Sequence, residues 1–225
     1  MQKFILLFII SFLLSCSAKT KKNEINIGDY DFEFPSDFKI VDGKGIDSYV
    51  GKIRGDSIWF GFDYGYYSDP LIESQQEFLD KKHWLLNAQN QFMKEGVTYD
   101  ESNSPKVELI KLRPANQKDT IKFKGADFIA TCKYDSLTFD YPITIPEETK
   151  AHFIQVDTLQ NHLRKIVIAK DPMNDLTGIY LKDLNGFNES INNSLALSMA
   201  TSKITKQQQD TVLKIFSTLR FIKKK

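Results

Sequence analysis

The chain has 225 residues, with 30 basic and 29 acidic side chains, so its formal net charge is only +1. The charges form no basic stripe, and nucleic-acid binding normally requires clustered lysine and arginine, so a nucleic-acid partner is excluded. The roughly 210 residues behind the apolar start are enough for one domain with a substantial core.

The first fifteen residues, MQKFILLFIISFLLS, have the features of an export signal. Lys3 supplies a positive start, and residues 4–14 form an apolar core, whose length suits a signal sequence of roughly 7–15 apolar residues. That core is shorter than the roughly 20 residues needed to span a bilayer. The segment Leu13-Leu14-Ser15-Cys16 follows and resembles the lipobox of bacterial lipoproteins.

This resemblance implies that Cys16 is acylated and becomes the first residue of the mature chain. Ser17 stands where an aspartate would resemble an inner-membrane retention signal, which favours the outer membrane. The next residues are basic, whereas some lineages mark surface export with an acidic run, so the periplasmic leaflet is favoured. The alternatives are an ordinary cleaved signal with an incidental cysteine and a cytosolic protein with an apolar start.

The expected organisation is therefore a signal peptide over residues 1–15, a lipidated Cys16 and polar tether over residues 16–23, and a single domain over residues 24–225. In that domain the first strand is predicted for residues 30–35, where aromatic and polar residues alternate until Pro35. A glycine-rich loop over residues 41–56 follows, with a short strand around residues 48–53. Residues 58–70, IWFGFDYGYYSDP, predict the next strand.

One long helix is predicted to begin at Ser74. Ser74-Gln75-Gln76-Glu77 has the pattern of a capping box, in which the serine and glutamate side chains satisfy free backbone N–H groups. Pairs of apolar residues then recur every seven positions up to Phe92-Met93, which gives the helix one apolar stripe. Lys94 and Gly96 suit its C-terminal end. We expect this helix to lie on a sheet.

The rest of the chain is dominated by alternating patterns. Strands are predicted for residues 106–113, 120–125, 127–134, 137–143, 152–158, 162–170 and 194–200. The strands at 152–158 and 162–170 form a hairpin with its turn near Leu159-Gln160. Thr205 begins a last helix in capping-box form, and residues 220–222 form a short edge strand. This order predicts an α+β fold: a mainly antiparallel sheet with two main helices packed on it.

Two segments of this pattern, FEFPSDFKI at residues 32–40 and VLKIFSTLRF at residues 212–221, resemble the two ends of the PsbP/Mog1-like fold. That family includes small lipid-anchored bacterial proteins of the DcrB kind. The resemblance implies a sheet with helices packed on it. It implies no functional residue, because the family mostly lacks a shared catalytic apparatus.

The sequence offers little catalytic chemistry. His83 has no second ligand nearby on its helix, and the hairpin places His152 and His162 on the order of 20 Å apart, which excludes a shared metal. Cys132 lies in an apolar alternating run and is expected to be a buried hydrophobe. The nucleophile elbow, the dinucleotide-binding loop and the calcium loop are each incomplete. We therefore predict no catalytic residue, metal or cofactor.

The aromatic run offers one candidate ligand site. In a strand, one face carries Phe60, Phe62, Tyr64 and Tyr66 and belongs to the core. The other face carries Trp59, Gly61, Asp63, Gly65 and Tyr67, so that a carboxylate lies between two glycines. Glycines in a strand often mark a close approach, by a packed element or by a ligand. Either a helix packs there and Asp63 bonds to backbone amides, or Trp59 and Tyr67 form stacking walls with Asp63 as a polar anchor.

Three functional hypotheses follow. The first is a non-enzymatic, lipid-anchored protein of the cell envelope that binds a ligand or serves as an accessory module. The second is a periplasmic interaction protein, such as an immunity factor that neutralises a toxin, with the loop at residues 43–55 as a contact. The third is an uncharacterised hydrolase that uses Asp63. In the first two hypotheses a membrane is a partner, through the lipid, and the second adds a protein partner.

Overall fold

The computed structural model describes residues 22–43, 45, 47–92 and 106–222. The predicted signal peptide, Cys16 and most of the predicted tether lie outside these residues. Within the described part, 48% of residues are in strands and 20% in helices, and the strands form three antiparallel sheets. No helix among these residues is long and apolar enough to cross a membrane.

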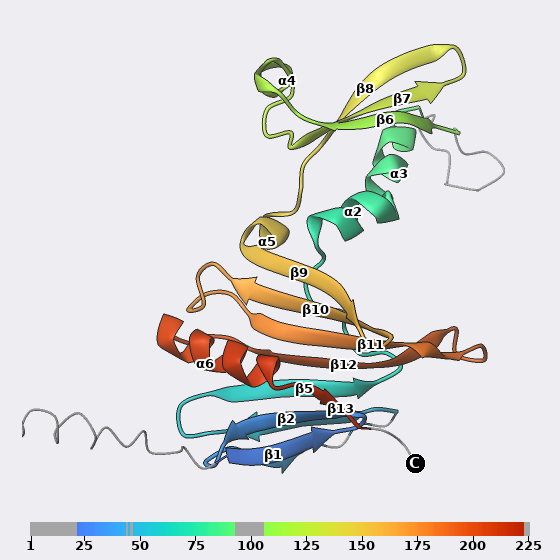
Figure 1. The fold of residues 1–225 in the computed structure, drawn as a ribbon. Coiled ribbons are helices and arrows are strands. Elements are labelled where there is room, and N and C mark those ends of the chain that lie inside the picture. The colour runs from blue at the N-terminus through green and yellow to red at the C-terminus, as the bar shows by residue number, and fades with distance from the viewer. Residues whose placement is uncertain (1–21, 44, 46, 93–105, 223–225) are drawn as a thin grey trace, which may run out of the picture.

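A seven-stranded antiparallel sheet forms the centre of the molecule (Figure 1). Its strand order is β3–β4–β5–β12–β11–β10–β9. Their bounds are β3 Lys39–Asp42, β4 Tyr49–Arg54, β5 Trp59–Gly65, β9 His152–Leu159, β10 His162–Ala169, β11 Thr177–Asn188 and β12 Asn193–Thr201. The predicted hairpin of residues 152–170 is confirmed, with β9 and β10 paired from His152↔Ala169 to His162↔Leu159.

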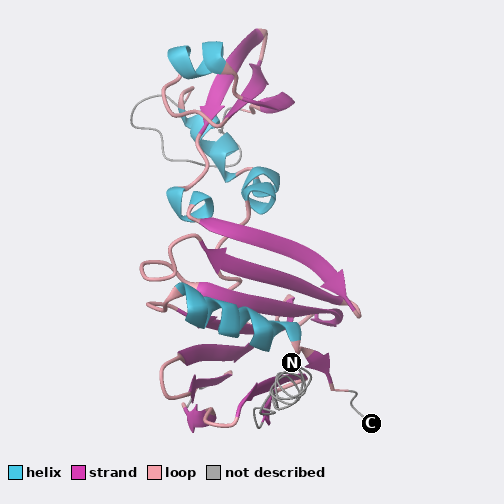
Figure 2. Ribbon diagram, turned by 60° about the vertical axis from the view of Figure 1, so that its left-hand side comes forward, coloured by secondary structure: helices cyan, strands magenta, loops and turns pink. Residues whose placement is uncertain are grey.

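A smaller sheet and the longest described helix cover one face of the central sheet, which we call the inner face. The small sheet has the order β1–β2–β13, with β1 Lys22–Ile27, β2 Tyr30–Pro35 and β13 Arg220–Phe221, and the helix is α6, Lys206–Ser217. Figure 2 shows α6 lying along the strands of the central sheet. Rings from all three parts meet in one core, where the centroids of Phe34 and Phe216 lie 5.6 Å and 6.1 Å from that of Phe60.

A second cluster of buried side chains lies at the other end of the molecule. It is built by the sheet β6–β7–β8 and by short helices, and Figure 1 shows that sheet far from β1. The bounds are β6 Glu108–Pro114, β7 Phe128–Tyr134, β8 Leu137–Ile143, α2 Gln75–Lys81, α3 His83–Asn90, α4 Gln117–Lys122 and α5 Glu147–Lys150. Leu79 and Trp84 pack there with Cys132, which is fully buried as predicted. The single domain over residues 24–225 stays a prediction.

The predicted α+β class, with two main helices and a PsbP/Mog1-like arrangement, is wrong. The described residues form a mainly β protein with five short helices, of which only α6 reaches twelve residues. The long helix expected from Ser74 has the predicted capping box but stops at Lys82, where φ is +54°. A left-handed residue cannot continue an α-helix, so α2 and α3 are separate. The predicted end at Lys94 and Gly96 lies outside the described residues.

Two further segments differ from their predictions. Residues 120–125 were expected as a strand, but the first three of them belong to α4, because Asn116 caps that helix and Asp119 completes its capping box. Arg113 also holds Asp119 through two hydrogen bonds. At the other end, β1 begins at Lys22 and so takes in the last two residues of the expected tether.

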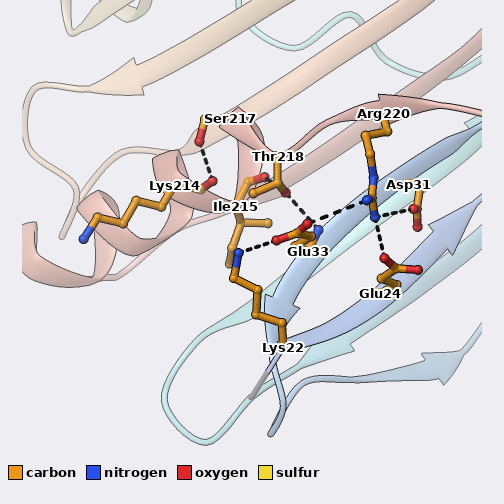
Figure 3. Close-up of polar contacts among 9 residues, drawn as sticks. All are labelled: Lys22, Glu24, Asp31, Glu33, Lys214, Ile215, Ser217, Thr218 and Arg220. Atoms are coloured by element: carbon orange, nitrogen blue, oxygen red, sulfur yellow. Dashed lines mark hydrogen bonds and ion pairs between the residues drawn. The ribbon is translucent and has the colours of Figure 1, made fainter. Parts of the chain in front are cut away.

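A network of charged groups joins the first and last strands (Figure 3). Arg220 on β13 lies 2.7 Å from a carboxylate oxygen of Glu24 on β1 and 2.9 Å from one of Asp31 on β2. Glu33 on β2 pairs with Lys22, and its backbone N–H donates to the Thr218 hydroxyl at the end of α6. Exposed pairs are individually weak, so the network mainly fixes how these strands are aligned.

A buried glutamine fastens α6 to the central sheet. The Gln209 side chain is fully buried, and its amide donates to the Ala169 carbonyl and to the Thr177 hydroxyl, both at 2.9 Å. The side chain of Lys206 donates to the glutamine oxygen at 2.6 Å. Buried polar groups that lose their partners are costly, so this contact fixes the helix in one position.

We expect Gln209→Met to lower the free energy of unfolding by about 1–3 kcal/mol, because it leaves the Ala169 and Thr177 acceptors buried without this donor. Urea denaturation measures the change. Gln207→Met is the matched control on the same helix, since Gln207 is exposed. Equal effects of the two substitutions would contradict the assigned role.

Candidate functional site

Strand β5 separates the core from the candidate site. Phe60 and Phe62 point to the inner face and are buried, as predicted, while Tyr64 is half-buried and donates to Asp29 at 2.9 Å. Trp59, Gly61 and Asp63 alternate with them and therefore lie on the opposite side of the central sheet, which we call the outer face. The strand ends at Gly65, so Tyr66 and Tyr67 lie beyond it.

The two glycines that flank Asp63 have different surroundings. A Cβ at Gly65 would lie 2.6 Å from the Cβ of Ser48, so the chain itself packs closely there. A Cβ at Gly61 would meet no atom within 4 Å. The expectation of a tightly packed neighbour therefore applies to Gly65, whereas the space above Gly61 is open.

Asp63 belongs to a row of polar side chains that crosses four neighbouring strands. Strand register places Asp63 beside Ser198, Ser198 beside Tyr180, and Tyr180 beside Lys165. Paired residues point to the same side, so all four lie on the outer face, with strands about 4.8 Å apart. Ser198, Tyr180 and Lys165 are buried, and Asp63 has one carboxylate oxygen that is buried without a hydrogen-bond partner among the described residues.

The row ends in a buried ion pair that the sequence analysis missed. Lys165 is only 1% exposed, and its Nζ lies 2.7 Å from an oxygen of Glu77, the residue that completes the capping box of α2. Burial disfavours the charge on Glu77, but hydrogen bonds from Lys165 and Ser74 outweigh it and lower the pKa of Glu77 below its ordinary value of 4.5. Burial, with the carboxylates of Glu77 and Asp69 nearby, raises the pKa of Tyr180 to about 12.

Residues 66–74 cover the half of the outer face that carries the polar row, over β10, β11 and β12. The Ser68 hydroxyl bonds to the carbonyls of Asp63 and Ala196, and Lys165 reaches the carbonyl of Ile72. A Cβ added at Gly178 would lie 2.8 Å from the Leu71 side chain, so Leu71 packs where the strand lacks a side chain. The polar row is therefore largely enclosed by residues 66–74 and is held as part of the structure.

The other half of the outer face, over β3, β4 and β5, is hollowed. A depression of about 530 Å³ is lined by residues that include Trp59, Val41 and Lys52, and a second of about 550 Å³ shares Val41 and Lys52 and reaches Gly61. Trp59 is 49% exposed, and the Lys52 ammonium lies 5.7 Å from its ring centroid, within reach of a cation–π interaction. This half of the outer face is therefore open, whereas the half that carries the polar row is covered.

The three residues predicted to bind a ligand are not gathered at one point. Trp59 and Asp63 share a face but are four residues apart, which is about 13 Å along a strand. Tyr67 is 67% exposed and follows the end of β5, beyond Asp63 as seen from Trp59. Trp59 and Tyr67 therefore do not form opposite walls of one small pocket around Asp63.

The remaining candidate residues do not form a centre either. Within the described ranges, no three His, Cys, Asp or Glu side chains are grouped to hold a metal. His152 is buried, with its Nδ1 2.7 Å from the Glu148 carbonyl, and its Nε2 has no partner there. Burial, followed by the charge of Asp140, raises the pKa of the Cys132 thiol, which suits the predicted inert role.

Comparison with known proteins adds no relative, because neither a known protein family nor a curated protein matches this sequence. Functional inference therefore depends on the residues of this chain alone.

We expect Glu77→Gln to lower the free energy of unfolding by about 3 kcal/mol, because it leaves the buried Lys165 ammonium without its counter-charge. Glutamine can keep the capping box through its one oxygen, but its NH2 group then faces the Lys165 ammonium, so both the charge and the acceptor for Lys165 are lost. Urea denaturation of Glu73→Gln, which breaks the more exposed pair with Lys81, is the control. Adding Lys165→Met to Glu77→Gln restores much of the loss. If Glu77→Gln lowers the free energy of unfolding no more than Glu73→Gln does, the ion pair does not hold α2 to the sheet.

This ion pair also predicts the pH dependence of stability. The folded-state pKa of Glu77 lies below its ordinary value of 4.5, so its ionised form stabilises the fold fully above that pH. The contribution is lost as the pH falls below 4.5 towards the folded-state pKa. The difference in unfolding free energy between the wild type and Glu77→Gln should therefore shrink over that acidic range.

Alanine substitutions at the two glycines of β5 should have different effects on the free energy of unfolding. Gly65→Ala should cost about 1–3 kcal/mol, because its new methyl group is forced against Ser48. Gly61→Ala should be neutral or stabilise by up to about 1 kcal/mol, because the space is open and alanine is less flexible in the unfolded chain. Thermal unfolding of both variants tests this, and a destabilising Gly61→Ala would mean that the outer face is not open there.

Proposed function

We propose that this protein is a non-enzymatic, lipid-anchored binding module of the bacterial cell envelope, attached through Cys16 on the periplasmic side of the outer membrane. The observation that carries the proposal is the order of positive start, apolar core and Leu13-Leu14-Ser15-Cys16 within the first sixteen residues. An apolar leader of this kind has no use inside a soluble fold.

The start of the fold supports attachment at this point. Strand β1 begins at Lys22, six residues after Cys16, and a fully extended link of that length spans at most about 20 Å. Lys19 and Lys21 lie within this link, and each basic residue near an anionic surface adds about 1 kcal/mol of attraction. The acyl chains would therefore hold the central sheet close to the membrane.

The binding surface in this proposal is the open half of the outer face around Trp59, Lys52 and Gly61. It combines an aromatic ring, a free ammonium group and open space above a glycine. The enclosed half, with Asp63 at its margin, supports that surface.

A protein partner is the second candidate function, and one observation favours it. Strand β9 is an edge of the central sheet and, among the described strands, pairs with β10 alone, over eight consecutive residues; its Phe153 and Val156 are exposed. It has no proline, lysine or bulge, the devices that normally protect an edge strand. An interaction protein could add a strand there.

Metabolic labelling with an alkyne fatty acid tests the anchor. We expect the wild type to be labelled and Cys16→Ala to lose the label, because the cysteine is the acylated residue. Cys132→Ala is the matched control and should keep the label, since Cys132 is buried. An unlabelled wild type in a host that processes lipoproteins would refute the anchor.

A further inference from the structure

The open half of the outer face carries a cluster of basic residues around an exposed tryptophan. Strand register aligns Lys39 with Arg54 and Arg54 with Trp59, and it aligns Val41 with Lys52 in the next row. Because paired residues point to the same side, all five side chains share one face. We call this set, Lys39, Val41, Lys52, Arg54 and Trp59, the basic–tryptophan face.

The charges of this face are not neutralised by ion pairs among the described residues, although Lys52 lies within cation–π reach of Trp59. None of Lys39, Lys52 and Arg54 forms an ion pair with another described residue, although lysines and arginines elsewhere in the described chain do. Asp56 is the acidic residue that lines the adjoining depression, and its backbone N–H is bonded to Asp37. Even with these two carboxylates nearby, the three cations predominate on the face itself.

The basic–tryptophan face also carries two exposed apolar side chains. Trp59 is 49% exposed and Val41 is 50% exposed, so each presents about half of its surface to the surroundings. Tryptophan is enriched where membranes meet water, because its ring is apolar and its N–H is polar. Basic side chains at the same level are attracted to anionic headgroups. The combination matches a lipid surface better than a small uncharged ligand.

The N-terminal link joins the fold beside this face. The Asn23 side chain, on the second residue of β1, donates to the Phe38 carbonyl at 3.0 Å. Phe38 directly precedes Lys39, whose row also contains Arg54 and Trp59. A chain running from Cys16 into β1 therefore enters on the inner-face side, next to the edge strand β3 and the row that contains Arg54 and Trp59.

We propose that the basic–tryptophan face rests on the anionic headgroups of the membrane that holds the lipid anchor. This inference rests on the proposed attachment at Cys16 and adds the orientation of the attached protein. Lys39, Lys52 and Arg54 contact headgroup phosphates, and the Trp59 ring enters the interface. The sheet β6–β8 lies far from β1 in Figure 1 and takes no part in this contact.

Tryptophan fluorescence tests this orientation directly, because the chain has only two tryptophans. Trp59 is half exposed, whereas Trp84 is buried in the second cluster. The lipidated full-length protein is reconstituted into vesicles of phosphatidylglycerol with dibrominated phosphatidylcholine, whose bromines quench nearby rings. We expect quenching that approaches half of the total emission, with the emission of Trp84 retained.

Variants identify the source of the signal. Trp59→Phe should leave emission that brominated lipid does not quench. Replacing Lys39, Lys52 and Arg54 with glutamine should reduce the quenching several-fold, as should omitting phosphatidylglycerol or raising the salt concentration. The matched control replaces the exposed lysines Lys118, Lys124 and Lys133, near or on β6–β8, with glutamine and should quench like the wild type.

Two outcomes overturn the inference. Quenching that is equal in the two triple variants means that the basic residues do not orient the protein. Absence of quenching in a protein that carries the alkyne fatty acid label means that the anchor exists but the face is turned elsewhere, for example towards a soluble anion or a protein. Loss of the label itself would refute the attachment instead, so the two failures are distinguishable.

Discussion

The ion pair between Lys165 and Glu77 is the contact on which the arrangement of the outer face depends. A lysine that is buried on an interior strand needs a counter-charge, and Glu77 supplies it from the first turn of α2. The same glutamate bonds the backbone N–H of Ser74, so one side chain both begins the helix and attaches it to the sheet. Residues 66–74 are thereby held across β10, β11 and β12, while β3, β4 and β5 stay uncovered.

Side-chain size determines where that covering segment can lie. Gly178 leaves room for Leu71, and the small residue Ala200 lies beside it. Ala200 pairs in turn with Gly61 on β5. A Cβ placed at Gly61 would lie more than 4 Å from any neighbouring atom. The covering segment starts at the end of β5 and crosses to β12 and β11 without passing over Gly61. Small residues on the outer face therefore serve two purposes, close packing over the central strands and an open hollow over the edge strands.

Much of the fold could be predicted from local sequence, because most strands have one buried side. The alternation of residues 137–143 and 194–200 matched β8 and β12, and the capping boxes at Ser74 and Thr205 marked real helix starts. The strand β11 was missed, since its first half is buried on both sides and so does not alternate. The break at Lys82 was missed as well, because nothing in the heptad spacing signals a left-handed residue.

The candidate site was predicted only in part, for a related reason. The sequence singled out Trp59 and Asp63 as outward residues of one strand, and the structure places them on one face. Neighbours across strands depend on register between distant segments, so the row from Asp63 to Lys165 could not be read from any single segment. One signal was available: Lys165 lies between Leu163 and Val167 on the apolar side of an alternating strand. A charge at such a position indicates a buried partner.

The position of the first strand connects the fold to the proposed membrane role. Because β1 begins at Lys22 and pairs with β2 along its whole length, the expected tether is two residues shorter than the sequence suggested. A shorter link allows fewer orientations of the attached body. Arg220 and Thr218 also bond to residues of β1 and β2, so the first and last described strands are held together in one small sheet. A short link favours surface contact by residues beside its point of entry, which here are those of the basic–tryptophan face.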